Sequence, residues 1–311
     1  MNAVFLFPGQ GSQSLNMMSG FNHSDVIRQT FAEASEVLNQ DLWALMNGED
    51  NTQLNETVNT QPLMLTAGIA TWRVCEQMNV PLPIALAGHS LGEYTALVAA
   101  GSLDFADAVK LVRLRAELMQ QAVPQGEGGM AAVLGLSDDQ VKQVCQETEQ
   151  ALSDRVVEAV NFNAPGQVVI AGHADAIKYA CELAKTKGAK RALPLSVSVP
   201  SHCRLMKPAA EKLAQKLAEI TFNPPKIRVV HNCDLQSHYE AEAIRRALVQ
   251  QLYLPVRWTE TIAGFVAEGL TQFAECGPGK VLTGLTKRID KSAQCSALIS
   301  EETIHNWINE H

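Results

Sequence analysis

The chain has 311 residues, of which 46% are hydrophobic and 19% are charged, and its formal net charge is −8. This composition is ordinary for a globular protein with a sizeable core, and the length allows one large α/β domain or a domain that carries an insertion. The negative charge argues against non-specific binding to nucleic acid or to an anionic membrane surface. No run approaches the roughly 18 uninterrupted apolar residues of a membrane-spanning helix.

The seven cysteines are scattered along the chain and none forms a C-x-x-C pair, so the sequence predicts neither a zinc site nor a disulfide framework. We expect most of them to be small buried side chains in a reducing compartment, which indicates a cytoplasmic protein. The apolar run at residues 1–7 has no basic segment before it and enters a Pro-Gly turn at once, so it predicts a first strand rather than a signal peptide.

Residues 2–7 are largely apolar and stop at Pro8-Gly9, which predicts a buried parallel strand. The loop that follows is Gly9-Gln10-Gly11-Ser12-Gln13, and its two glycines allow the backbone to approach a ligand closely. Such a loop at the end of a strand could form one wall of an oxyanion hole. The alternative is a phosphate loop, but the Lys-Ser/Thr of a P-loop and the third glycine of a dinucleotide motif are missing.

Two amphipathic helices are predicted next. The first has its apolar face on Ile27, Phe31, Ala34 and Leu38, and the second on Met64, Ala67, Thr71 and Cys75. We expect the second helix to begin near Pro62, because proline is favoured in the first turn.

The sequence Gly88-His89-Ser90-Leu91-Gly92 follows the short apolar run 84–87 and precedes the helix-forming run 93–100. A buried strand, a serine between glycines and a helix are the context of a nucleophile elbow. That turn would aim the hydroxyl of Ser90 at a helix N-terminus, where developing negative charge is favoured. The bare G-x-S-x-G pattern is a weak signal, and a tight turn that merely contains a serine is the alternative.

The predicted helix at residues 104–121 carries an arginine in its apolar stripe. Helical spacing places Arg115 on the same face as Leu111, Val112, Leu118 and Met119. A core-facing guanidinium is costly unless it is paired. An internal salt bridge and a clamp for a substrate carboxylate both fit this pattern, and on the pattern alone both stay open.

The pattern changes after residue 126. The order strand, helix, strand, strand, helix, strand over residues 126–197 is that of a ferredoxin-like fold. We therefore expect residues 126–197 to form a small α+β subdomain that is inserted into a large α/β domain made of residues 1–125 and 198–311.

His202 lies in the loop before a helix whose apolar face is expected on Ala209, Leu213, Leu217 and Ile220. The positive end of a helix dipole disfavours the imidazolium, and a neutral imidazole is what a general base should be. A lone loop histidine is otherwise more often simply exposed. The later runs 227–231 and 270–275 predict two further strands.

Four motifs occur together in this order: Phe7-Pro8-Gly9-Gln10-Gly11-Ser12-Gln13, Gly88-His89-Ser90-Leu91-Gly92-Glu93, Val199-Pro200-Ser201-His202 and Gly277-Pro278-Gly279-Lys280. With them the chain closely resembles, over essentially its whole length, the malonyl-CoA:acyl-carrier-protein transacylases of type II fatty acid synthesis. The resemblance implies an α/β-hydrolase-like domain with a parallel sheet and a nucleophile elbow, plus the inserted ferredoxin-like subdomain.

The resemblance also implies the role of each site residue. Ser90 corresponds to the nucleophile that accepts the acyl group, and His202 to its general base. Gln251 matches the glutamine whose backbone orients the histidine, so the family uses a Ser-His pair without a triad acid. One departure is Leu254, which stands before Pro255 where relatives tend to carry asparagine.

The backbone N–H groups of Gln10 and Leu91 correspond to the oxyanion hole. Arg115 falls on the malonate-binding arginine of the family, which favours the clamp over the internal salt bridge. The implied reaction is a ping-pong transfer of malonyl from malonyl-CoA, through a malonyl-serine, to the phosphopantetheine thiol of an acyl carrier protein. Neither a metal nor a bound cofactor is implied.

The expected partners are coenzyme A thioesters and a strongly acidic acyl carrier protein. Because the chain is itself acidic, docking would need local basic groups, and we expect them at Lys190, Arg191, Lys287 and Arg288. Ordinary solvated surface is the alternative for these four residues. We expect a monomer.

Three other functions stay open. An α/β-hydrolase-like esterase or thioesterase also has G-x-S-x-G, but its triad order is Ser, Asp/Glu, His and it has no reason for an inward arginine. A polyketide-pathway acyltransferase would share all the motifs. A non-enzymatic module that binds a carrier protein would not need a reactive Ser90.

Overall fold

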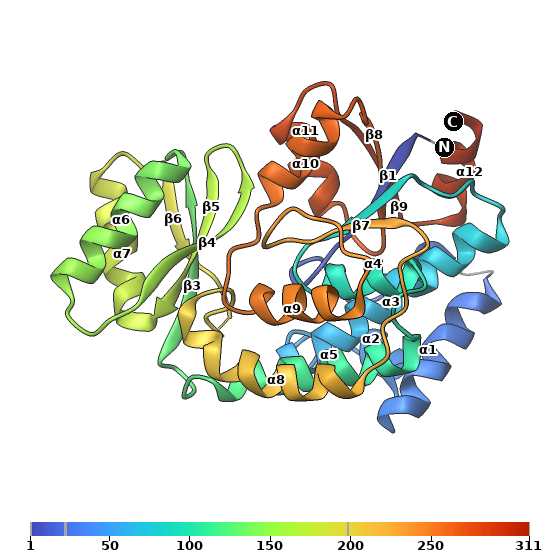
Figure 1. Cartoon of the computed structure of the whole chain (residues 1–311), viewed down its shortest axis with the longest axis horizontal. Helices are drawn as coiled ribbons and strands as arrows, with labels where there is room; N and C mark the ends of the chain where they lie inside the picture. The colour runs from blue at the N-terminus through green and yellow to red at the C-terminus, as the bar shows by residue number, and fades with distance from the viewer. Residues whose placement is uncertain (1, 22–23, 198, 311) are drawn as a thin grey trace.

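The computed structural model describes residues 2–21, 24–197 and 199–310. Two sheets, each covered by helices, lie side by side along the long axis of the molecule (Figure 1). The α/β fold class expected from the sequence is confirmed.

The first sheet has five strands, all parallel, in the order β7-β2-β1-β8-β9. Its strands are β1 (Ala3–Phe7), β2 (Ala85–Gly88), β7 (Arg228–Val230), β8 (Gln272–Cys276) and β9 (Gln294–Leu298). Every residue of β1 is buried, as its continuous apolar run predicts for a central parallel strand. Phe7 is paired in register with Gly88, so the loops that follow β1 and β2 leave the sheet side by side.

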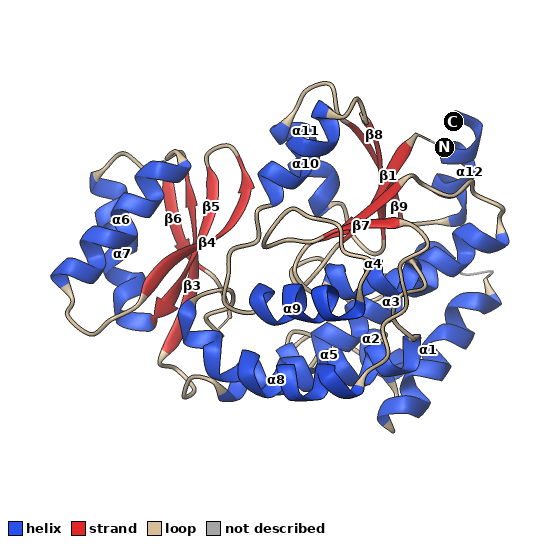
Figure 2. Cartoon of the chain, viewed as in Figure 1, coloured by secondary structure: helices blue, strands red, loops and turns tan. Residues whose placement is uncertain are grey.

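The two faces of β1 pack into separate apolar clusters, which makes the first body a three-layer structure. Phe5 and Phe7 contact Trp72, whereas Val4 and Leu6 join the cluster of Trp258. The helices on the Phe5 side that contribute to its cluster are α1 (Asp25–Leu38), α2 (Leu42–Met46), α3 (Thr57–Gln77), α4 (Gly92–Ala99), α5 (Phe105–Gln121), α8 (Lys207–Glu219), α9 (Ala241–Gln251) and α12 (Glu301–Glu310). The opposite face carries α10 (Trp258–Ala267) and α11 (Val281–Ile289) (Figure 2). Two short 3-10 helices are η1 (Ser19–Phe21) and η2 (Arg204–Met206).

The second sheet is antiparallel, in the order β4-β5-β3-β6. Its elements are β3 (Gly128–Leu134), α6 (Asp138–Ala151), β4 (Val157–Ala164), β5 (Gln167–His173), α7 (Ala174–Thr186) and β6 (Arg191–Pro194). This is the element order and strand order of a ferredoxin-like unit, with α6 and α7 packed on one face. The capping box that the sequence places at Ser137 and Gln140 is present at the start of α6.

All of these elements lie within residues 126–197. The division into residues 1–125 with 198–311 and residues 126–197 stays a prediction, and Ser198, at its second boundary, lies outside the described residues. The two bodies are joined by backbone hydrogen bonds, because Val256 donates to Val160 O and accepts from Phe162 N. No helix in the described ranges is both long enough and apolar enough to cross a membrane.

Candidate active site

The turn after β2 has the geometry of a nucleophile elbow. Ser90 has φ 51°, a left-handed conformation that is unusual for a residue with a side chain. A Cβ on Gly88 would lie 1.9 Å from the backbone of Gly92, and a Cβ on Gly92 would lie 2.0 Å from Phe7 O. Both positions therefore require glycine, and together they hold Ser90 at the start of α4, beside the carboxyl end of β1.

The structure brings Ser90 and His202 together. Ser90 Oγ lies 2.7 Å from His202 Nε2, and His202 Nδ1 lies 2.7 Å from the carbonyl oxygen of Gln251. Because a carbonyl only accepts, Nδ1 carries the proton and donates it, which leaves the lone pair of Nε2 facing the serine hydroxyl. The main-chain N–H of His202 also donates a hydrogen bond to Leu252 O, which holds the residue in place. The backbone of His202 is in the left-handed region, with φ 63°.

The imidazole of His202 is buried and held neutral. Burial, followed by the nearby positive charge of Arg115, lowers the pKa of His202 from 6.5 to about 3. From the sequence, a helix N-terminus is expected to favour the neutral imidazole, and His202 does precede η2 and α8. The main cause in the structure is instead desolvation, which the sequence pattern of a loop histidine did not predict.

The loop after β1 lies against the elbow. A Cβ on Gly9 would come within 2.4 Å of His89 O and 3.6 Å of Leu91 N, so the next residue, Gln10, is adjacent to Leu91. Both residues line the cavity above Ser90. Neither backbone N–H donates a hydrogen bond to another residue in the described part of the chain. The backbone N–H of Ser90, in contrast, donates a hydrogen bond to Asn232 Oδ1 at 2.8 Å.

Arg115 lies on the inner face of α5 with 1% of its surface exposed. Its Nη1 donates to Gln61 Oε1 at 2.7 Å, and its Nη2 donates to Gln251 Oε1 at 2.9 Å and to Ser90 Oγ at 3.3 Å. The guanidinium lies over the ring of Tyr94, 5.3 Å from its centroid. Arg115 makes no ion pair with any described carboxylate, and its buried Nε has no partner among the described residues. The internal salt bridge considered from the sequence is therefore not what holds this cation.

A cavity of about 370 Å³ connects these groups. Residues from both bodies line it: Gln10, Gln61, Ser90, Leu91, Arg115 and His202 from the first, and Met130, Asn161, Leu195 and Val197 from the second. Its polar groups therefore converge on one reacting position, with a nucleophile and base, two free N–H groups and a cation. No group of three or more His, Cys, Asp or Glu side chains in the described ranges could hold a metal ion.

Similarity to known proteins agrees with this geometry. Residues 4–309 match the family described as the acyl transferase domain. The chain belongs to this acyl transferase family. It is 54% identical over 296 residues to the malonyl CoA-acyl carrier protein transacylase of Salmonella typhimurium, with 95% of each chain covered. The resemblance expected from the sequence is confirmed.

Solved structures give the same result. An acyl carrier protein S-malonyltransferase from Vibrio cholerae is 51% identical with a TM-score of 0.95, covering 99% of this chain and 100% of that one. A malonyl-transacylase solved in complex with its type II PKS acyl-carrier protein is 49% identical with a TM-score of 0.97, covering 99% of each chain. The two-body fold of this acyl transferase is thus the fold of these enzymes.

Several residues of the acyl transferase site were not singled out from the sequence. Gln61 and the side chain of Gln251 hold Arg115, and Asn232 holds the elbow. Asn161 reaches the cavity from β4, and its buried Oδ1 has no partner among the described residues. The one available signal was Glu93, a charged residue in the first turn of the apolar helix α4, where it is completely buried.

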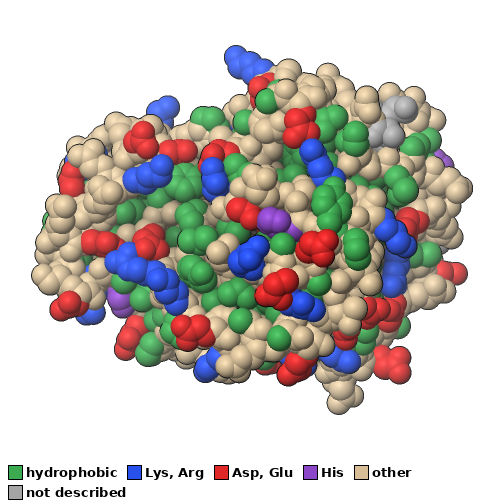
Figure 3. Space-filling view, in the orientation of Figure 1, with side chains coloured by type: hydrophobic (Ala, Val, Ile, Leu, Met, Phe, Trp, Pro, Cys, Tyr) green, Lys and Arg blue, Asp and Glu red, His purple; other side chains and the backbone are tan. Residues whose placement is uncertain are grey.

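Three of the four expected docking residues lie together, away from the catalytic cavity. Lys190, Arg191 and Arg288 line a separate hollow of about 490 Å³ between the second sheet and α11. Lys287 is exposed but does not line this hollow. Acidic and basic side chains are interspersed over the face seen in Figure 3, so that face has no broad basic surface.

Proposed function

We propose that this acyl transferase moves a malonyl group from malonyl-CoA to the phosphopantetheine thiol of an acyl carrier protein, through a malonyl ester on Ser90, and so supplies fatty acid synthesis. The observation that carries this proposal is Arg115. A buried cation without an acidic partner, 3.3 Å from the nucleophile, suits an acyl group that ends in a carboxylate.

In the first half-reaction, His202 Nε2 takes the proton of the Ser90 hydroxyl while Oγ attacks the thioester carbonyl. The backbone N–H groups of Gln10 and Leu91 stabilise the oxyanion that forms. The carbon–sulfur bond then breaks, the imidazolium returns its proton to the thiolate, and coenzyme A leaves as the thiol. Malonyl remains as an ester of Ser90.

In the second half-reaction, the carrier protein's phosphopantetheine thiol gives its proton to His202, and its sulfur attacks the malonyl ester. The tetrahedral intermediate collapses with loss of Ser90 Oγ, which recovers the proton from His202. The Ser90–His202 pair needs no acidic residue as a third member, because the carbonyl oxygen of Gln251 keeps the imidazole in the tautomer that both half-reactions use.

An esterase or thioesterase is a weaker alternative. In a serine hydrolase triad the second imidazole nitrogen pairs with a carboxylate, whereas here it pairs with a main-chain carbonyl. Hydrolysis also gives no reason to keep a desolvated guanidinium beside the serine. Transfer of an acyl group that ends in a carboxylate fits the site better.

We place the carrier protein at the hollow of Lys190, Arg191 and Arg288, with Lys287 beside it. Arg191, Leu193 and Leu195 occupy every second position of β6 and its extension, so their side chains share one face of the strand and mark a path from this hollow to the catalytic cavity. Leu195 lines the catalytic cavity, and Leu193 and Leu195 are 48% and 39% exposed. A flexible arm could lie along this path with its phosphate at the basic end.

A polyketide-pathway carrier protein is the second candidate acceptor, since one neighbour was solved with a type II PKS carrier protein. We further propose that the enzyme acts as a monomer in the cytoplasm, where its seven free thiols would stay reduced. It needs no bound cofactor in the mechanism above.

Mass spectrometry after mixing with malonyl-CoA tests the proposed function. We expect one malonyl adduct on the Ser90 peptide, which disappears when a holo carrier protein is added and reappears on its phosphopantetheine. Release of free malonate at the same rate with and without carrier protein would instead identify a hydrolase. If no malonyl adduct forms on Ser90, the result would indicate a non-enzymatic module that binds a carrier protein.

A further inference from the structure

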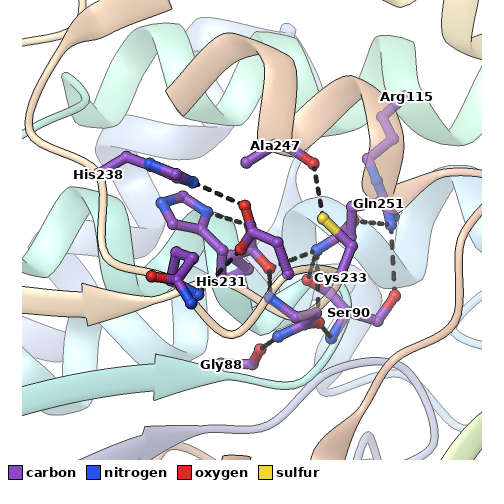
Figure 4. A network of polar contacts seen from close by, with 12 residues as sticks. Gly88, Ser90, Arg115, His231, Cys233, His238, Ala247 and Gln251 are labelled. Carbon is purple, nitrogen blue, oxygen red and sulfur yellow. Dashed lines mark hydrogen bonds and ion pairs between the residues drawn. The ribbon is translucent and has the colours of Figure 1, made fainter. Parts of the chain in front are cut away.

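The side chain of Gln251 contacts Arg115 and the main chain of Ser90 (Figure 4). Its main-chain carbonyl contacts the base, His202. Its Oε1 accepts from Arg115 Nη2 at 2.9 Å, and its Nε2 donates to Ser90 O at 2.9 Å. Its main-chain oxygen accepts from His202. Gln251 is completely buried at the end of α9, so these contacts are made without competition from water.

The neighbours of this amide allow only one orientation. Ser90 O can only accept a hydrogen bond, and a guanidinium can only donate one. The NH₂ end of Gln251 must therefore face the elbow and its oxygen must face Arg115. A glutamine turned the other way would place an N–H donor against Arg115 and an oxygen against a carbonyl oxygen.

Glu93 reinforces this orientation. Its Oε2 accepts from Gln251 Nε2 at 3.1 Å and from Asn232 N at 2.9 Å, and its Oε1 lies 2.6 Å from His231 Nδ1. Glu93, Asn232 and His231 are fully buried. The carboxylate that fixes the amide is thus itself fixed by the segment after β7.

We propose that the Gln251 side chain, oriented by Glu93, is a specificity-determining positioning residue that holds Arg115 ready for the carboxylate of the acyl donor. The inference rests on the proposed malonyl transfer. Among the described residues, Gln61 and Gln251 are the two side chains that accept from the guanidinium besides Ser90, one on each Nη. Without the acceptor on Gln251, the guanidinium must be ordered when the substrate binds. The entropic cost of that ordering weakens binding only of an acyl donor that carries a carboxylate.

The test compares acylation of Ser90 by malonyl-CoA and by acetyl-CoA in the wild type and in Gln251→Leu. The substitution keeps the main-chain carbonyl that orients His202 and removes the amide, with its contacts to Arg115, Ser90 O and Glu93. Loss of the elbow contact should lower kcat/KM for both donors, but only malonyl-CoA also depends on Arg115, so we expect the malonyl-to-acetyl ratio of kcat/KM to fall about tenfold or more, as for loss of a hydrogen bond to a charged group. Gln250→Leu is the matched control, since the neighbouring side chain makes no hydrogen bond in the described part of the chain.

Glu93→Gln tests whether Glu93 acts through Gln251. It should lower the malonyl-to-acetyl ratio in the wild type, and should lower it little further in the Gln251→Leu background, because the two changes affect one network. Additive effects would remove Glu93 from the proposal.

Equal losses for both donors in Gln251→Leu, or an unchanged ratio with a normal melting temperature, would overturn the proposal. If Gln251→Leu does not fold, Gln251→Met serves instead, because it keeps the length of the side chain without an amide. The ratio should again fall, and an unchanged ratio would again contradict the proposal. Failure of the wild type to form a malonyl adduct would refute the proposed function itself and is a separate outcome.

Discussion

The guanidinium of Arg115 and the hydroxyl of Ser90 lie 3.3 Å apart, although one comes from the middle of α5 and the other from the turn after β2. A permanent cation is thereby placed beside a nucleophile without a carboxylate to neutralise it. Desolvation lowers the pKa of Arg115, which reflects the cost of burying this charge unpaired. A substrate carboxylate would remove that cost, so selectivity and catalysis share one location.

Removing this cation should change which acyl group is accepted. We expect Arg115→Ala to lower kcat/KM for malonyl-CoA by on the order of ten- to several-hundred-fold, from loss of a charged hydrogen-bonded pair. Acetyl-CoA has no carboxylate, so its transfer should be spared or improved. The measurement is kcat/KM for both donors, with a melting curve for each protein.

A purely structural role for Arg115 would give a different result. Both donors would then weaken alike and the melting temperature would fall in parallel. An unchanged malonyl-to-acetyl ratio would therefore contradict the clamp.

The proposed dyad is tested by removing each partner. We expect Ser90→Ala to give no acyl adduct, and His202→Ala to slow both half-reactions by about 10²–10⁴-fold, the usual contribution of a general base. Single-turnover acylation followed by mass spectrometry measures the first half-reaction, and transfer to carrier protein the second. Near-normal transfer by either variant would contradict the assignment.

The depressed pKa of His202 gives an expectation for pH dependence. Because this pKa lies at about 3 in the folded protein rather than at 6.5, the base should stay neutral through mildly acidic pH. The acylation rate should therefore show no loss centred on pH 6.5. A rate that titrates with an apparent pKa near 6.5 would show that the imidazole is solvated during the reaction.

The same shift affects stability. Between pH 6.5 and about 3 the unfolded chain binds a proton at His202 that the folded chain does not, so the free energy of unfolding should fall as the pH drops through this range. His202→Gln should make that decline less steep. Urea unfolding of both proteins at several pH values checks the sign.

The sequence predicted those parts of the site that depend on local structure. The buried strand β2 and the glycines around Ser90 are adjacent in the chain, so their geometry follows from short-range sterics. The partners of Arg115 could not be found this way, because Gln61 and Gln251 lie 54 and 136 residues from it in sequence. Only the family resemblance pointed to Gln251, and it pointed to the backbone rather than the side chain.

Among the elements of the fold that differ from the sequence prediction, β9 and α3 do so for clear physical reasons. The strand β9 was missed because it is an edge strand whose residues are mostly half-buried, so it lacks an apolar run. The helix expected to begin near Pro62 is α3, which begins at Thr57 and contains the proline in its interior. Proline is favoured in the first turn of a helix, but burial of the residues around Pro62 outweighs that preference here.

Docking of the carrier protein should depend on the hollow rather than on basic charge in general. We expect the double change Arg191→Glu and Arg288→Glu to raise KM for carrier protein on the order of fivefold to tenfold, most strongly at low salt. Lys287→Glu, outside the hollow, is the matched control and should have a smaller effect. Acylation by malonyl-CoA should not change. Equal effects on both half-reactions would indicate that these residues act on the fold or on coenzyme A.

The elbow itself should tolerate no side chain at its second glycine. A Cβ on Gly92 would lie 2.0 Å from Phe7 O, which is backbone in the central strand and cannot move aside, so Gly92→Ala should abolish acylation and destabilise the protein by several kcal/mol. Gly284 lies in α11 with nothing within 4 Å of a Cβ placed there, so Gly284→Ala should leave activity intact and raise stability by up to about 1 kcal/mol. Denaturant unfolding and Ser90 labelling of the two variants test this contrast. A folded and active Gly92→Ala would mean that the turn can open without losing the position of Ser90, which would contradict the rigid elbow described here.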